Sequence, residues 1–196
     1  MMKQIIKKKI AEVGFSLLSP EQIKKLSAAK IVTPELYDID GYPVDGGLMD
    51  LRLGATSPGV RCRTCGGRLQ ECLGHPGSID LARPVLHVKY ISLIEIGLRC
   101  FCPECGKLKL EDKFLNKYSP SQRLKKAKDA KKCPHCGAIC EKIKLDKPTN
   151  FYIGKKRIFP TEIRERLVKI PDEELKKIGI NPQTCRPEWA LSLIHI

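Results

Sequence analysis

The sequence predicts an irregular α+β fold, in which two bound zinc ions stabilise several helices and short strands. Three observations support this class. Six of the ten cysteines form pairs with two residues between them, a spacing typical of zinc sites. The hydrophobic content of 42% is enough for a core, although the aromatic content of 6% is low. Signals for short helices and strands alternate along the chain, and turns rich in Gly and Pro separate them.

The composition indicates a soluble, cytoplasmic protein with no membrane partner. The formal net charge is +14, and nucleic acid is the commonest cytosolic polyanion, although charge alone does not separate DNA, RNA and a merely soluble surface. The first 19 residues are no secretion signal, because Lys7, Lys8, Lys9 and Glu12 interrupt their apolar stretch. No apolar run reaches the roughly 18 residues of a membrane span. Cysteine pairs in a reducing compartment favour metal over disulfides.

The first helix is expected between Met1 and Lys30, a segment that reads as mostly helical. Ser19 can cap a helix that has Pro20 at its first position, Gln22 can close a capping box, and the helix should run to about Ala28. Residues 31–59 are rich in Gly, Pro and Asp, so we expect an irregular segment whose apolar residues dock on something else.

The strongest motif of the chain is a pair of ligand pairs, Cys62 with Cys65 and Cys72 with His75. A gap of two residues lets one tight turn direct both side chains of a pair at one point. Sulfur and imidazole nitrogen are the ligands that Zn²⁺ takes in tetrahedral sites. Four protein ligands leave no open position, so the motif predicts a structural zinc site.

Short elements should follow this site. Residues 78–81 and 85–88 resemble strands divided by Pro84, and Tyr90 to Leu98 has the apolar spacing of a helix. His87 is expected to be a structural histidine and no ligand.

A second zinc site is predicted from two repeats of the pattern C-P-x-C-G. Its ligands are Cys102, Cys105, Cys133 and Cys136, which form a zinc ribbon closed around a long excursion. Cys100, Cys140 and His135 stand nearby and are left out of the ligand set. A redox role for the pairs is the alternative, although no thioredoxin-like βαβ pattern surrounds them.

The excursion is the most basic part of the chain. Residues 99–147 contain 14 Lys and Arg against 6 Asp and Glu, a net charge of +8. We expect phosphate contacts from a cluster of lysines: Lys125, Lys126, Lys128, Lys131 and Lys132. A solvated helical face is the alternative. Aromatic interleaving, which is typical of single-strand binding, is absent here apart from Tyr118.

The last third of the chain predicts a strand and two helices. Residues 150–153 read as the strand, with basic residues beside it. Thr161 can cap a helix that runs to Val168, and Pro171 can start another that stops at Gly179. Cys185 has no evident partner.

The order and spacing of these motifs resemble a known family. The first ligand set, the run from Ile79 to Val85 and the second pair with Gly106 and Lys107 are similar to the start of the largest subunit of multisubunit DNA-directed RNA polymerases, archaeal A′ type. The segments 46–50 and 186–189 are also similar. Three positions depart from the family pattern without removing a ligand: Leu51, Leu73 and Pro76.

The resemblance implies that the chain is the clamp portion of a polymerase, which holds DNA and the RNA–DNA hybrid. Residues 1–98 would be the clamp base with the first zinc, residues 99–147 the basic clamp head with the second, and residues 148–190 a continuation of the clamp. The catalytic Asp-rich loop with its Mg²⁺ lies outside these residues, so the chain is part of an enzyme but holds no catalytic residue. Implied partners are other polymerase subunits, including the second-largest, and transcription factors.

Two rival functions remain open at this point. One is a free-standing zinc-ribbon protein that binds nucleic acid or acts as an adaptor, and the other is a thiol oxidoreductase. Residues 191–196, Leu-Ser-Leu-Ile-His-Ile, match one reading frame of a common sequencing adaptor. We therefore expect this tail to be non-native, with a genuine short strand as the alternative.

Overall fold

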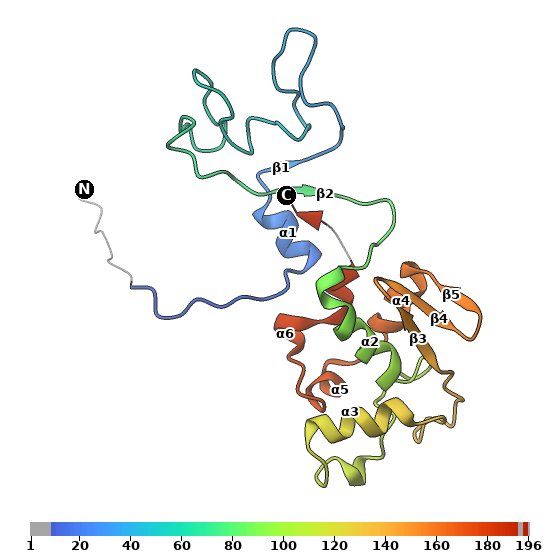
Figure 1. The fold of residues 1–196 in the computed structure, drawn as a ribbon. Helices are drawn as coiled ribbons and strands as arrows, with labels where there is room; N and C mark the ends of the chain where they lie inside the picture. The colour runs from blue at the N-terminus through green and yellow to red at the C-terminus, as the bar shows by residue number, and fades with distance from the viewer. Residues whose placement is uncertain (1–8, 192–193, 196) are drawn as a thin grey trace.

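The computed structural model describes residues 9–191, 194 and 195 (Figure 1). A helical body holds most of the residues after position 85, and a lobe of loops, residues 31–76, projects from the opposite side of the first helix. We call this segment the loop lobe. Between the body and the loop lobe lies a small sheet to which three distant segments contribute. No helix within the described ranges is long and apolar enough to cross a membrane.

The first helix, α1 (Pro20–Leu26), begins as the sequence predicts. The Ser19 hydroxyl accepts a hydrogen bond from the Gln22 amide at 3.2 Å, and the Gln22 side chain accepts one from the Ser19 amide at 2.8 Å. The expected helix before residue 19 is wrong for residues 9–18, which form no regular element. Ile10, Val13 and Phe15 are exposed, and of residues 9–18 only Leu17 packs against the core, while a short helix with so little packing is marginal in water. Residues 1–8 of that expectation lie outside the described part.

The small sheet has the order β1-β2-β6. Strand β1 (Ala29–Lys30) runs parallel to β2 (Gly77–Ile79), and β6 (Ile194–His195) pairs with β2 in the antiparallel sense. The loop lobe therefore leaves the sheet after β1 and returns to it at β2. Its residues 31–59 are irregular, as expected, apart from an isolated bridge between Tyr37 and Pro43.

A buried carboxylate organises this part of the loop lobe. Asp50 is 1% exposed, and its side chain accepts hydrogen bonds from the amides of Gly46, at 2.6 Å, and Arg52, at 2.9 Å. The Arg52 guanidinium also bonds this carboxylate, with Nε 3.0 Å from one oxygen. Because these donors stabilise the ionised form, first among them the Arg52 side chain, the pKa of Asp50 lies well below its ordinary value.

The connection into the body differs from the prediction. β2 ends at Ile79, and the expected strand 85–88 is wrong because the chain there crosses to the body and bonds the 3-10 helix η3 (Pro187–Leu191). The His87 amide donates to the Ala190 carbonyl at 2.9 Å. A 3-10 helix, η1 (Val88–Tyr90), follows. The His87 ring accepts from the Lys89 amide at 3.3 Å, which fits the structural role expected of it.

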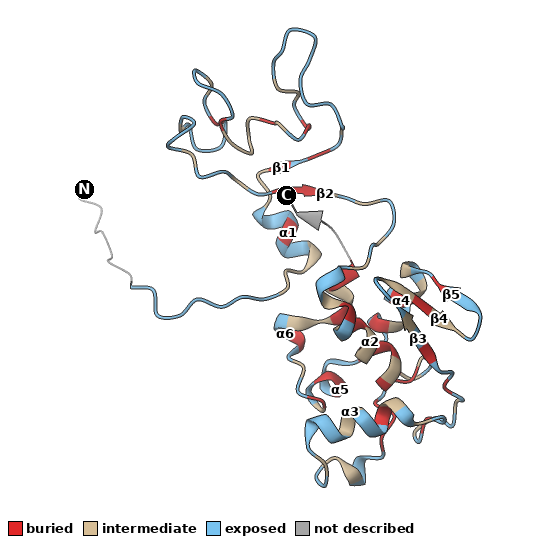
Figure 2. Cartoon of the chain, viewed as in Figure 1, coloured by how far each residue is buried: buried red, intermediate tan, exposed pale blue. Residues whose placement is uncertain are grey.

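The core of the body forms around α2 (Ile91–Cys100), close to the helix predicted at 90–98. Its apolar face, with Ile94 fully buried, packs against α4 (Pro160–Val168) and the 3-10 helix η3 (Pro187–Leu191). Gly97 permits this approach, since a Cβ there would lie 2.5 Å from a methyl carbon of Leu167. Figure 2 shows buried residues concentrated in the body, while most of the loop lobe is exposed.

Beyond α2 the chain forms the basic excursion. It contains a 3-10 helix, η2 (Asp112–Phe114), and α3 (Pro120–Asp129), which packs against α2. Arg123 on α3 ties the excursion together, because its guanidinium donates to the carbonyls of Tyr118, Leu115 and Lys177. This arginine is therefore a structural residue.

A three-stranded antiparallel sheet follows, with the order β3-β4-β5. It is formed by β3 (Ile143–Asp146), β4 (Asn150–Ile153) and β5 (Lys156–Ile158), and only β4 was predicted. Helix α4 is capped by Phe159 and has Pro160 at its first position, so the expected cap at Thr161 is wrong by two residues. The helix expected from Pro171 to Gly179 is α5 (Asp172–Lys176), which has Pro171 at its N-cap position and ends before Gly179. Helix α6 (Pro182–Cys185) precedes η3.

Candidate metal centres

Three cysteine turns of the chain share one backbone geometry. They begin at Cys62, Cys102 and Cys133, and in each the amide of this cysteine donates to the carbonyl five residues later, at 2.9 Å. Its own carbonyl accepts from the amide of a glycine four residues later. Those glycines have φ values of +69° to +73°, a conformation that costs glycine little. The turn therefore aims two sulfur atoms at one point.

The first predicted ligand set comes together within the loop lobe. The ligand atoms of Cys62, Cys65, Cys72 and His75 all lie within 4.8 Å of one another. The His75 backbone is held by a 2.7 Å hydrogen bond from its amide to the Leu53 carbonyl. Its ring Nε2 is buried and has no hydrogen-bond partner among the described residues. A buried imidazole nitrogen needs a partner, and a metal ion would satisfy it.

The second predicted set also converges, although its two halves lie far apart in sequence. Cys102 Sγ is 3.5 Å from Cys136 Sγ, and Cys105 Sγ is 3.7 Å from Cys133 Sγ. A tetrahedron with Zn–S bonds of about 2.3 Å has edges of about 3.8 Å. The four sulfur atoms thus stand at nearly the separations that a tetrahedral ion requires, and both clusters can hold a metal.

Backbone amides favour the thiolate form of one cysteine in each cluster. Burial raises the pKa of the Cys62 thiol, but the amides of Cys65 and Thr64 outweigh it and bring this pKa to about 6. Burial likewise raises the pKa of Cys102, and the amides of Cys105 and Glu104 bring it down to about 7. Since the thiolate is the metal ligand, these amides prepare one sulfur of each site for an ion.

The three cysteines left out of the ligand sets belong to neither cluster. Cys100 is in the core on α2, its Sγ 3.8 Å from the Leu124 carbonyl, and burial raises its pKa to about 11. Cys140 packs against Cys102 and Cys133, and burial raises its pKa to about 11 as well. Cys185 lies on α6, outside both clusters.

His135 is likewise held by protein. Its Nε2 is 3.1 Å from the Leu110 carbonyl, which occupies this nitrogen in a hydrogen bond. The imidazole therefore ties the turn that begins at Cys133 to the segment that follows the turn at Cys102.

The second cluster is fixed to the body by contacts that sequence reasoning missed. The buried Glu174 on α5 accepts from the Leu108 amide at 2.8 Å, and its other oxygen is 2.6 Å from Lys177 Nζ. Gly106 fits closely against the segment after α4, since a Cβ there would lie 2.1 Å from the Lys169 carbonyl oxygen. Glu174 is 66 residues from its partner, so no local pattern could have indicated the contact.

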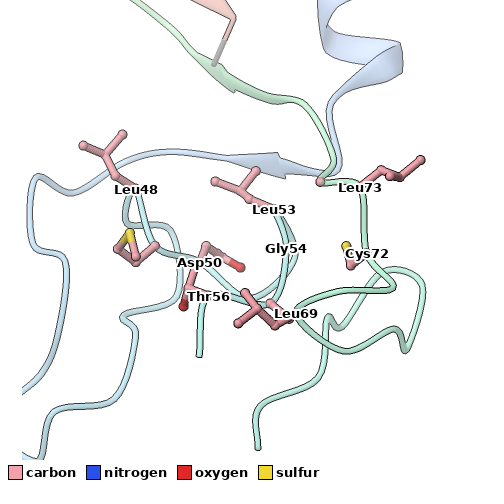
Figure 3. A pocket seen from close by; sticks show the side chains of 11 residues that line it. Leu48, Asp50, Leu53, Gly54, Thr56, Leu69, Cys72 and Leu73 are labelled. Carbon is pink, nitrogen blue, oxygen red and sulfur yellow. The ribbon is translucent and has the colours of Figure 1, made fainter. Parts of the chain in front are cut away.

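A pocket of about 350 Å³ that is open to solvent adjoins the first cluster (Figure 3). Leu48, Leu53, Leu69 and Leu73 line it together with Cys72. Asp50 and Thr56 also line it, and Leu73 is fully exposed, so the pocket does not enclose the site in hydrocarbon.

The five predicted phosphate-contacting lysines lie on α3 and just after it. Lys125, Lys126, Lys131 and Lys132 are exposed, and Lys128 is half-buried. One of them already has an aromatic partner, because Lys126 Nζ lies 4.5 Å from the centroid of the Tyr118 ring. The structure leaves the other three exposed ammonium groups accessible to a polyanion.

Comparison with known proteins places the chain in a family. The family model described as RNA polymerase Rpb1, domain 1, matches residues 7–194. The chain is 45% identical to the DNA-directed RNA polymerase subunit Rpo1N of Methanocaldococcus jannaschii, over 96% of the chain and 16% of that subunit. It is 46% identical to the Rpo1N subunit of Thermoplasma acidophilum and 44% identical to that of Thermococcus celer, each alignment covering 23% of the relative. The chain thus spans less than a quarter of these relatives.

Proposed function

The chain belongs to the RNA polymerase Rpb1 domain 1 family, and on this premise we propose that it forms the N-terminal clamp portion of the largest subunit of a cytoplasmic DNA-directed RNA polymerase. In this role it holds DNA and the RNA–DNA hybrid during transcription. The observation that carries the proposal is the pair of converged ligand sets, in the family's order, within a strongly basic chain.

Each ligand set holds one structural zinc ion. The donor sets, three thiolates with one imidazole and four thiolates, suit Zn²⁺ and leave no open coordination position. The metals stabilise segments that have little core of their own, above all the exposed loop lobe. Nucleotide transfer with its Mg²⁺ belongs to a part of the subunit outside these residues.

The loop lobe faces other polymerase subunits, including the second-largest, and transcription factors. Ile39 and Leu73 are fully exposed at loop tips, and Val32 is 72% exposed. Exposed apolar side chains gathered on one lobe are typical of a protein interface. A free-standing adaptor would have to keep these side chains in water.

The α3 lysines contact phosphates of the DNA held by the clamp. Each neutralised phosphate releases condensed counterions, which gives the dependence of binding on salt a slope of roughly 0.9 per contact on duplex DNA. Contacts of lysine to phosphate carry no base information, so their loss should be similar for all sequences.

The test compares assembled polymerases that carry the full-length subunit. In one variant the five lysines are changed to Gln: Lys125, Lys126, Lys128, Lys131 and Lys132. We expect weaker retention of DNA and a flatter salt dependence, with zinc content unchanged. A control changes Lys113, Lys117 and Lys156 to Gln, which removes three charges outside the cluster of five lysines. An unchanged slope in the five-lysine variant would show that these lysines form a solvated face.

A second arm addresses the clamp itself. Elemental analysis of the chain should find two zinc ions, and a tagged full-length subunit should copurify with the other polymerase subunits. A subunit that binds nucleic acid alone and copurifies with none of them would support the free-standing zinc-ribbon alternative.

A further inference from the structure

The outer face of the sheet β3-β4-β5 carries a row of side chains that no core residue covers. Along each strand, residues alternate between the two faces. Ile143, Phe151 and Ile158 point inward and are buried in the main core. Their neighbours in sequence, Lys144 and Arg157, are exposed, and Tyr152 is half-buried.

The register of the strands places these three side chains side by side. Lys144 on β3 pairs with Tyr152 on β4, and Tyr152 pairs with Arg157 on β5. Neighbouring strands lie about 4.8 Å apart, so a positive charge flanks the tyrosine on each side. Two more exposed basic residues lie close by in sequence, Lys142 just before β3 and Lys155 in the turn between β4 and β5.

The groups in this row have no competing partners in the described part of the chain. Neither Lys144 nor Arg157 has an acidic group within ion-pair distance there, whereas Lys156, on the other face, lies 3.6 Å from Glu162. The Tyr152 ring has no cation over it among the described residues. The ring of Tyr118, in contrast, is covered by Lys126 and stacks on Phe114 at 5.7 Å.

We propose that this outer face binds a single-stranded nucleic acid, with one base stacked on Tyr152 and the adjoining phosphates on Lys144 and Arg157. Stacking on an aromatic ring between basic groups is how proteins hold single strands without reading their sequence. The proposal rests on the proposed function, because transcription separates DNA strands and makes RNA beside the clamp. It adds a second nucleic-acid-binding surface beside the one proposed at the α3 lysines.

Single strands fit this row better than other polyanions. In a duplex the bases are stacked inside the helix, so the tyrosine ring would contribute nothing and the cations alone would bind. An acidic protein segment would also use only the cations. The ring at the centre of the row is therefore the feature that distinguishes the three ligands.

The experiment measures protection of single lysines in the assembled polymerase. The enzyme is treated with an amine-acetylating reagent while oligodeoxythymidylate or oligouridylate is titrated, and mass spectrometry follows each lysine. We expect both strands to protect Lys144 and to leave Lys156 reactive. In Tyr152→Ala the oligonucleotide concentration that half-protects Lys144 should rise about 5- to 150-fold, because one stacked base is lost. In Tyr152→Phe this concentration should stay unchanged, because the ring remains.

Salt dependence supplies a second readout. Arg157→Gln should lower the slope of Lys144 protection by roughly 0.7, the value for one contact on a single strand, and Lys156→Gln should not change it. The proposal fails if single strands protect Lys144 at the same concentration in the Tyr152→Ala enzyme as in the unmodified enzyme. It also fails if duplex DNA or polyglutamate protects Lys144 as well as single strands do. If Lys144 stays reactive in an enzyme whose DNA retention still depends on the α3 lysines, this proposal fails while the clamp assignment stands.

Discussion

Two glycines in equivalent positions of the second metal centre should respond differently to the same substitution. Gly106 and Gly137 each follow the second cysteine of a C-P-x-C-G turn, and their φ values are +69° and +73°. Alanine at either position must adopt a left-handed conformation, which costs about 1–2 kcal/mol. At Gly137 the added methyl meets open space. At Gly106 it would lie 2.1 Å from the Lys169 carbonyl oxygen, a backbone atom that cannot rotate away.

The steric clash at Gly106 should therefore make the two variants differ in their free energy of unfolding. Overpacking of this kind costs about 1–3 kcal/mol, so Gly106→Ala should lose about 2–5 kcal/mol in the free energy of unfolding and Gly137→Ala about 1–2 kcal/mol. Urea unfolding of the zinc-loaded chain can be followed by the fluorescence of Trp189, the one tryptophan of the sequence. Zinc content should stay at two ions in both variants, because no ligand changes.

If the two alanine variants unfold at the same urea concentration, the contact between the first turn of the ribbon and the segment after α4 contributes nothing to stability. A loss of one zinc ion from Gly106→Ala alone would instead show that this contact holds the ligand geometry itself.

Further predictions concern the metals, the buried carboxylate and the excursion. Cys62→Ser should lower the zinc content from two ions to one, whereas Cys140→Ser should keep two, as elemental analysis can show. Asp50→Asn should cost about 1.5–3 kcal/mol in urea unfolding at neutral pH, because the hydrogen bonds to the charged acceptor are lost. Since the side chain of Arg52 lowers the pKa of Asp50, this contribution is present at neutral pH and is lost as the pH falls through that lowered value. Arg123→Gln should cost about 1–3 kcal/mol through unpaired carbonyls, yet leave the salt slope of DNA binding unchanged. Sequencing of the gene should show whether the last six codons are those of the adaptor.

The convergence of the two ligand sets could be predicted from sequence because the turns that hold the cysteines are local. Each cysteine turn closes its hydrogen bonds within six residues, and the two ligands of a pair belong to one turn. The capping box at Ser19 is local in the same sense and was also predicted correctly. The converged sulfurs of Cys102 and Cys136 needed one further assumption, that two identical turns share one ion.

Features that depend on pairing between distant segments could not be predicted in this way. The basic excursion showed no aromatic interleaving apart from Tyr118, yet strand register places Tyr152 between two cations. Lys144 and Arg157 are 13 residues apart in sequence, and only the antiparallel pairing brings them to one row. The prediction of a helix before residue 19 was wrong for a related reason, because a local sequence pattern does not show whether apolar residues will pack against a core.

The different spans of the two ligand sets determine when each can form during protein synthesis. The first set is complete within 14 residues, from Cys62 to His75, whereas the second begins at Cys102 and is completed only at Cys136. Chains grow at about 5–20 residues per second, so the 61 residues between His75 and Cys136 take roughly 3–12 s to add. We expect the loop lobe to take up its ion while the ribosome is still making the rest of the second site. The second ligand set can dock on the body only later, when α5 has been synthesised and Glu174 can accept from the Leu108 amide.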